Sequence, residues 1–113
     1  MIISIPWGFS GNVNKFALFG GGYSGGAPVS TTSVYTYASN TAVAGGNLSY
    51  TANGLAAAGN SVVGVFGGGN SGSSSLSTTS VYTYSSNTAV AGGNLSYSAF
   101  YLAACAPNTG VNS

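Results

Sequence analysis

The sequence almost entirely lacks charge. Among 113 residues there is no Asp, Glu, His or Arg, and Lys15 is the one charged side chain, whereas ordinary soluble domains are about 25% charged. Without carboxylates or imidazoles there is no general acid–base pair, no Ser-His-Asp triad and no carboxylate pair for glycoside hydrolysis. Carboxylate-bound metals and His- or Cys-rich zinc sites are excluded for the same reason. We therefore predict that the protein is not an enzyme and has no catalytic residue, no cofactor and no metal.

The net charge of +1 also removes one class of partner. Nucleic-acid binding requires a patch of Lys and Arg that neutralises phosphates, so we expect no nucleic acid. No apolar run approaches the roughly 18–20 residues of a transmembrane helix, and we expect no membrane span. The opening segment MIISIPWGF lacks the basic region and the small-residue cleavage site of a signal peptide. The sequence alone leaves the compartment open.

Few groups remain that could carry chemistry. Cys105 is the one cysteine, so it forms no internal disulfide, and only Lys15 is available to activate its thiol. Free cysteines usually behave as small buried apolar side chains, and we expect the same here. The glycine-rich loops at residues 20–26 and 67–75 are followed neither by the Lys of a phosphate-binding loop nor by a helix. We expect them to be connections between strands.

What the sequence does have is a long internal repeat. Residues 30–50 and 77–97 are identical at 20 of 21 positions, and the one difference is Ala38 against Ser85. The offset of 47 residues extends beyond this block, because the run Phe-Gly-Gly-Gly at 19–22 recurs at 66–69. The chain therefore contains two copies of a 47-residue unit, with a partial unit at each end.

One period divides into four short segments of strand-like composition. They are residues 54–58, 62–66, 80–84 and 88–91, each bounded by Gly, Asn or Ser. Short apolar or alternating runs between such turn residues predict β-strands, and no segment predicts an amphipathic helix. In the third segment Tyr82 and Tyr84 share one face of the expected strand. The predicted fold class is all-β, with two tandem four-stranded antiparallel sheets.

Four strands in 40–50 residues is the pattern of a β-propeller blade. The run Val-Phe-Gly-Gly at 65–68 resembles the hydrophobic and double-glycine element of the kelch repeat, and Val-Tyr-Thr-Tyr at 81–84 resembles its tyrosine element. The first copy matches at 18–21 and 34–37. Where kelch repeats carry a tryptophan this chain has valine (Val43 and Val90), and it also lacks their charged residues. The resemblance is to a degenerate kelch-like repeat of the type found in phage and microbial surface proteins.

The resemblance assigns a structural role to ten residues of these elements. They are Phe19, Gly20, Gly21, Tyr35 and Tyr37 in the first copy, and Phe66, Gly67, Gly68, Tyr82 and Tyr84 in the second. Glycine permits positive φ or very close backbone approach where neighbouring sheets crowd together. Tyrosine offers a large apolar ring for packing between sheets and a hydroxyl that needs a partner. The galactose-oxidase branch of such propellers holds copper with His and Tyr, and a chain without His implies no such activity.

The repeat also sets the expected organisation. Blade one is predicted over residues 7–50, blade two over 54–97, and part of a further blade, beginning with a first strand at 100–105, over 98–113. Two blades do not close a ring, since propellers usually have 4–8 blades. Three chains would supply six blades, or the two blades belong to a longer repeat protein. We therefore expect a homo-oligomer or further repeats.

Two functional hypotheses follow. The first is a non-catalytic kelch-like propeller segment that acts as a binding or scaffold module on a phage particle or another extracellular surface. Its ligand would be a protein or a neutral carbohydrate, bound by Tyr, Asn, Ser and Trp7, although core packing is the expectation for the tyrosine pairs. The alternative is a self-associating fibrous β-protein, because uncharged segments rich in Gly, Asn and Tyr favour cross-β assembly. Asn47 and Asn94 match the N-glycosylation pattern but lie in repeat turns, and the sequence does not decide whether either is modified.

Overall fold

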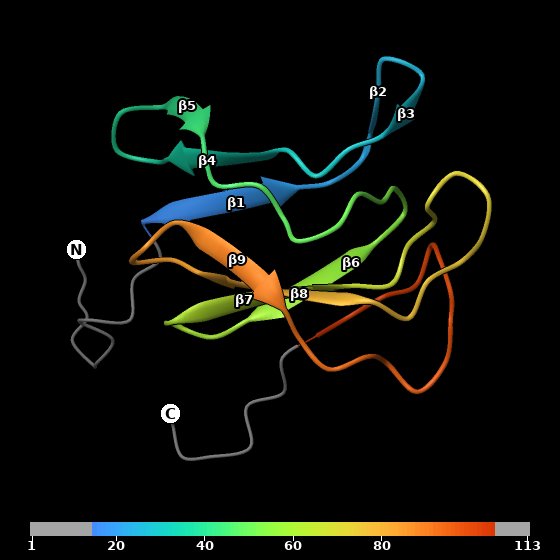
Figure 1. Ribbon diagram of the computed structural model, residues 1–113. Helices are drawn as coiled ribbons and strands as arrows, with labels where there is room; N and C mark the ends of the chain where they lie inside the picture. Colours follow the sequence, from blue (N-terminus) through green and yellow to red (C-terminus); the bar gives the residue numbers. More distant parts are fainter. Residues whose placement is uncertain (1–14, 106–113) are drawn as a thin grey trace.

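The computed structural model describes residues 15–105, and in this range the chain is all-β (Figure 1). Nine strands and no helix occur in the described part, so it includes no helix that could cross a membrane. The strands are β1 (Phe16–Gly20), β2 (Tyr23–Ser24), β3 (Ala27–Pro28), β4 (Thr32–Thr36), β5 (Thr41–Ala44), β6 (Ala56–Gly59), β7 (Val63–Gly67), β8 (Thr79–Thr83) and β9 (Thr88–Ala91). They form three antiparallel sheets, and none of these closes or curls into a barrel.

The second repeat forms a four-stranded sheet in the order β6-β7-β8-β9, in which each strand pairs with its neighbour in sequence. The four predicted strands are confirmed, with ends that differ by no more than two residues. At the turn between β8 and β9, Asn87 adopts a φ of +59°, a left-handed conformation that asparagine tolerates better than most residues. The short polar turns predicted from Gly, Asn and Ser therefore end the strands where expected.

The first repeat forms a three-stranded sheet in the order β1-β4-β5. Its strands match β7, β8 and β9 at the 47-residue offset. A segment equivalent to β6 would cover residues 9–12, which lie outside the described residues together with the rest of the predicted start of blade one at 7–14. Residues 106–113 of the predicted third unit also lie outside them.

The two copies fold alike in detail. The buried Thr32 donates from Oγ1 to the Gly46 carbonyl at 2.8 Å, and the equivalent Thr79 donates to the Gly93 carbonyl at 2.8 Å. The backbone hydrogen bonds of the loops that follow β5 and β9 repeat in the same way. The loop geometry is therefore a property of the repeat sequence.

The connection after β1 differs from the sequence prediction. Residues 20–26 were expected to form only a connection, but β2 and β3 make a small hairpin there, with Gly25 and Gly26 at its turn. Both glycines have positive φ, +63° and +88°, which is the backbone geometry of a tight type I′ hairpin turn. In the second copy only an isolated bridge between Asn70 and Ser75 remains.

Each repeat sheet has two faces, which we name from their side chains. The aromatic face carries Phe66, Ser80 and Tyr82 in the second sheet, and Phe19, Ser33 and Tyr35 at the equivalent positions of the first. The aliphatic face carries Leu18 and Val34 in the first sheet, and Val65 and Val81 in the second. The sheets lie one above the other (Figure 1) with the aliphatic face of the first on the aromatic face of the second, where the core of the molecule is found.

The beginning of the predicted third unit is held against the second sheet without forming a strand. Ala99 makes an isolated bridge with Leu76, as Ala52 does with Val29, but residues 100–105 form no strand. In the preceding unit β6 is a strand because it pairs with β7. Within residues 15–105 no strand pairs with residues 100–105, and the expected first strand is not observed there.

Candidate functional site

The contact between the two sheets is the best-defined constellation of side chains in the described residues. Its centre is a buried apolar cluster of Leu48, Phe66 and Tyr82, which are 5%, 4% and 1% exposed. Half-buried side chains that pack against this cluster come from both sheets and from the segment between them; they are Leu18, Leu55 and Ala89. The contact is therefore a joint core of two sheets, neither of which buries these residues alone.

Glycine makes the close approach of the sheets feasible. A Cβ atom added at Gly20 would lie 2.9 Å from Cε2 of Phe66, so the ring occupies the space that any other side chain would need. Gly21 follows with a φ of +72°, and a Cβ there would lie 3.0 Å from the Ala52 carbonyl oxygen. The double glycine of the first copy thus uses both properties predicted for it, close approach at one residue and positive φ at the next.

The tyrosine of the second copy joins the sheets by hydrogen bonds. The Tyr82 hydroxyl donates to Oδ1 of Asn87 in its own sheet and accepts from the Gly46 N–H of the first repeat at 3.2 Å. Gly46 lies so close to the second sheet that an added Cβ would collide with the Asn87 carbonyl oxygen. The buried Tyr82 phenol thus uses its hydroxyl both as a donor and as an acceptor to join the two repeats.

Two further hydrogen bonds connect the loop after β5 to the second sheet. The Ser49 N–H donates to Oγ of the fully buried Ser80 at 3.0 Å, and the Tyr50 hydroxyl donates to the Gly68 carbonyl at 2.8 Å. Burial raises the pKa of Tyr50 from 10.0 to about 12. Sequence reasoning treated this loop as a turn. The signal that it missed is Leu48 and Tyr50, two large side chains within an otherwise small-residue connection.

The predicted structural residues do not all lie in this contact. Phe19 is 63% exposed although its equivalent Phe66 is buried, and Tyr35 is half-buried although Tyr82 is fully buried. Two others, Tyr37 and Tyr84, are 53% and 40% exposed. The Tyr84 ring lies over Gly64 on the aromatic face, which raises the pKa of its hydroxyl by burial. Gly67 and Gly68 are buried under Leu95 and Leu102 respectively.

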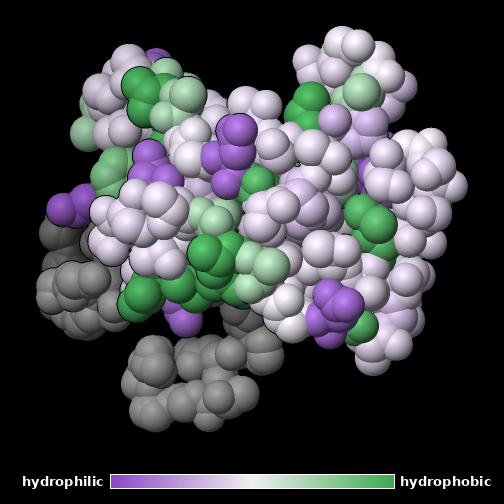
Figure 2. Space-filling model, in the orientation of Figure 1, coloured by the Kyte–Doolittle hydropathy of each residue, from purple (hydrophilic) through white to green (hydrophobic). Residues whose placement is uncertain are grey.

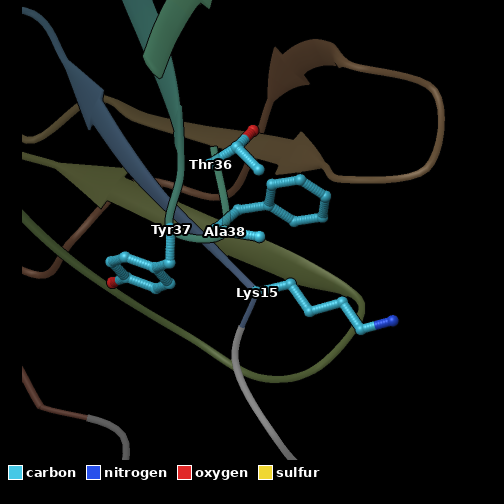
Figure 3. A pocket seen from close by; sticks show the side chains of 5 residues that line it. Lys15, Thr36, Tyr37 and Ala38 are labelled. Atoms are coloured by element: carbon cyan, nitrogen blue, oxygen red, sulfur yellow. The ribbon is translucent and has the colours of Figure 1, made fainter. Parts of the chain in front are cut away.

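An open hollow lies at the start of β1, beside the turn that joins β4 and β5 (Figure 3). Its lining is Lys15, Phe16, Thr36, Tyr37 and Ala38. The Lys15 side chain extends away from Tyr37 and Ala38 in Figure 3, as expected of a solvated ammonium group. The sequence contains no carboxylate or imidazole side chain that could pair with this amine.

The other residues considered as candidates from the sequence do not form a common site in the described residues. The described residues contain no cluster of three or more His, Cys, Asp or Glu side chains that would hold a metal. Cys105 is exposed, and the expectation that it is buried is wrong, because the segment that carries it pairs with no strand. Asn47 and Asn94 are both exposed in the loops that follow β5 and β9. Trp7 lies outside the described residues.

The surface is neutral and of intermediate polarity. In Figure 2 most of the visible residues are pale, with separate hydrophobic groups and a few hydrophilic residues between them. The exposed large apolar side chains include Phe16, Phe19, Val43, Val62 and Val90, each more than half exposed. Comparison with known proteins identifies no relative, since no protein-family model matches the chain and no curated protein matches it significantly.

Proposed function

We propose that this chain is a non-catalytic structural module, a segment of a kelch-like β-propeller that acts as a scaffold or binding unit within a larger assembly. The observation that carries this proposal is the stacking of two equivalent sheets through contacts made by repeat positions. A meander of four consecutive antiparallel strands, as in β6 to β9, is the arrangement of a propeller blade. Repeat proteins of this type are stabilised mainly by contacts between neighbouring units.

The proposed location follows from the resemblance to kelch-like repeats, and the proposed ligand class follows from the composition. Degenerate kelch-like repeats of this kind belong to phage and microbial surface proteins, and we propose a virion or an extracellular surface as the location. The ligand class is a protein or a neutral carbohydrate, because the exposed groups are amides, hydroxyls and aromatic rings rather than charges. The exposed tyrosines that would contribute are Tyr23, Tyr37, Tyr97 and Tyr101.

Hydrogen exchange measured by NMR tests the proposed scaffold. Stacked sheets predict slow exchange for the Gly46 and Ser49 amides, because their partners lie on the second sheet at 3.2 and 3.0 Å. In protein dilute enough to stay monomeric, the equivalent Gly93 and Ser96 amides have no such partner within the described chain and serve as internal controls. Fast exchange at all four amides, with protection elsewhere, would show separate sheets and reject the stacked scaffold.

The fibrous alternative has one structural observation in its favour. Within the described residues β5, β6 and β9 each have a hydrogen-bonded neighbour on one side only. An unpaired strand edge that carries no charged side chain can form backbone hydrogen bonds with a strand of another chain. Thioflavin fluorescence and electron microscopy of the purified chain distinguish the two functions, since fibres would favour the alternative and discrete particles the scaffold.

A further inference from the structure

The two outer faces of the stacked sheets complement each other, because each repeats one of the two faces that meet inside the chain. Within the chain, the aliphatic face of the first sheet covers the aromatic face of the second. This leaves the aromatic face of the first sheet and the aliphatic face of the second without a covering sheet in the described residues. Phe19 on one outer face is 63% exposed, and Val65 on the other is 39% exposed. Each outer face carries nearly the same residues as an inner face that already has a partner.

We propose that the aliphatic face of the second sheet binds the aromatic face of the first sheet in a second copy of this chain, head to tail. The inference rests on the proposed scaffold function, because it assumes that the contact between the two sheets is the contact by which such sheets associate. It adds the partner, the two surfaces and the contacting residues. Because the two surfaces are different, such an interface is heterologous and repeats from copy to copy.

The apolar part of the proposed interface follows from the 47-residue offset. Inside the chain the Phe66 ring lies on Gly20, with Leu48 beside it. Between copies, Phe19 of the second copy would lie on Gly67 of the first, with Leu95 beside it. A Cβ added at Gly67 would have only Thr79 and Leu95 atoms as its three nearest neighbours, at 3.5–3.7 Å. No aromatic ring covers this glycine as Phe66 covers Gly20, but Leu95 buries it in the single chain, so Leu95 would have to shift for the Phe19 ring to lie there.

The hydrogen bonds of the internal contact have equivalents between copies, and the residues that would form them are of the same types. The Ser96 N–H would donate to Oγ of Ser33 in the second copy, as Ser49 donates to Ser80 within the chain. The Tyr97 hydroxyl would donate to the Gly21 carbonyl of the second copy, as Tyr50 donates to Gly68. Tyr97 is 61% exposed in the single chain, so its side chain is available for this contact.

The proposed contact differs from the internal one in several side chains and in its covalent connection. On the two faces that would meet, Val63 takes the place of Phe16 and Ala17 takes the place of Gly64. Leu18 of the internal contact is replaced by the smaller Val65. The internal sheets are also joined by the chain itself, which supplies a high effective concentration that two separate copies lack. We therefore expect association between copies to depend on concentration, whereas the internal contact does not.

Two variants disable one surface each without disturbing the fold. Gly93→Ala adds a Cβ that meets no atom within 4 Å in the single chain, and Gly93 does not have positive φ. Between copies this Cβ would collide with the Asn40 carbonyl of the second copy, as a Cβ at Gly46 would collide with Asn87. Phe19→Ser removes an exposed ring from the opposite surface.

Analytical ultracentrifugation of the full chain over a range of concentrations tests the inference. The wild type should form species larger than a monomer as its concentration rises. Each variant should associate at least about 30-fold more weakly, the loss typical when a central interface residue is removed. An equimolar mixture should form a 1:1 heterodimer that grows no further. In that pair the Phe19→Ser chain contributes its intact aliphatic face and the Gly93→Ala chain its intact aromatic face.

Several results would overturn the inference. These are a wild type that stays monomeric up to about millimolar concentration, variants that associate as tightly as the wild type, and a mixture that forms no heterodimer. Fibres that both variants form equally would also reject it. None of these results affects the scaffold itself, which is tested separately by amide exchange and by Gly46→Ala, a variant that should unfold the stack within one chain. Loss of association with protected Gly46 and Ser49 amides therefore rejects the head-to-tail contact alone.

Discussion

Replacing Phe66 by Ala tests whether the facing side chains hold the two sheets together. The Phe66 ring is 4% exposed and lies on Gly20 and beside Leu48, which both belong to the first repeat. Removing a buried phenyl ring loses its burial free energy and leaves a cavity, which typically costs about 3–5 kcal/mol. Gly20 has no side chain that could move into the cavity, so we expect a value in the upper half of this range. Native domains have a free energy of unfolding of about 5–15 kcal/mol, and the variant should lose a large share of it.

The matched control is Phe19→Ala, which makes the same chemical change at the equivalent position of the first copy. Phe19 is 63% exposed, and substitutions at such positions usually change stability by less than about 0.5 kcal/mol. Urea denaturation followed by tyrosine fluorescence compares the two midpoints in dilute protein, where copies do not associate. Equal losses for both variants, or a loss below about 1 kcal/mol for Phe66→Ala, would refute the joint core.

Three other changes have expected outcomes. Tyr82→Phe should lower the free energy of unfolding by about 1 kcal/mol, because it removes the two part-buried hydrogen bonds that the Tyr82 hydroxyl makes with Asn87 and Gly46. The Tyr35 hydroxyl donates to Oδ1 of Asn40 in an exposed hydrogen bond, whose loss in Tyr35→Phe should cost under about 0.5 kcal/mol; equal shifts in thermal melts would contradict this. Because the folded-state pKa of Tyr50 is raised to about 12, the contribution of this residue to stability is complete below pH 10 and lost between pH 10 and about 12. Tyr50→Phe should therefore flatten the fall in melting temperature at alkaline pH. An unchanged dependence of melting temperature on pH would refute this role of Tyr50. Gly21→Ala should destabilise the fold by about 1–2 kcal/mol in urea denaturation, because its φ of +72° is left-handed and the new Cβ approaches the Ala52 carbonyl oxygen; a neutral effect would contradict that geometry.

The strands could be predicted from the sequence because their signals are local. The run Val62–Phe66 and the alternation at 80–84 lie between Gly, Asn and Ser residues, and the observed β7 and β8 differ from these ranges by one residue at each end. The role of Gly20 and Gly21 was predictable for the same reason, since only glycine serves both at a point of close approach and at a positive φ. Sequence and structure agree for these local signals, and the exception is the hairpin of β2 and β3, whose Gly25-Gly26 turn is an equally local signal.

Burial could not be predicted in this way. Phe19 and Phe66 occupy the same position of the same motif, yet one is 63% exposed and the other 4%. No property of either residue or of its neighbours in sequence distinguishes them. The difference in burial arises because the aromatic face of the second sheet packs against the first sheet, whereas the aromatic face of the first sheet is not covered in the described residues. Cys105 illustrates the same limit. Its apolar character predicts burial, but in the described part of the chain its segment pairs with no strand and the side chain is exposed.

The duplication offers a physical reason for the absence of charge. A repeat position that is exposed in one copy is buried in the other, as Phe19 and Phe66 show, and Ser33 is half-buried where Ser80 is fully buried. A charge that would be harmless on the first aromatic face would therefore need desolvation on the second, which costs several kcal/mol without a partner. Neutral hydroxyl and phenol groups satisfy both environments, since they bond to water when exposed and to a neighbouring sheet when covered. The same reasoning explains why the two outer faces remain suited to burial, and therefore to a second copy, although nothing covers them within the described chain.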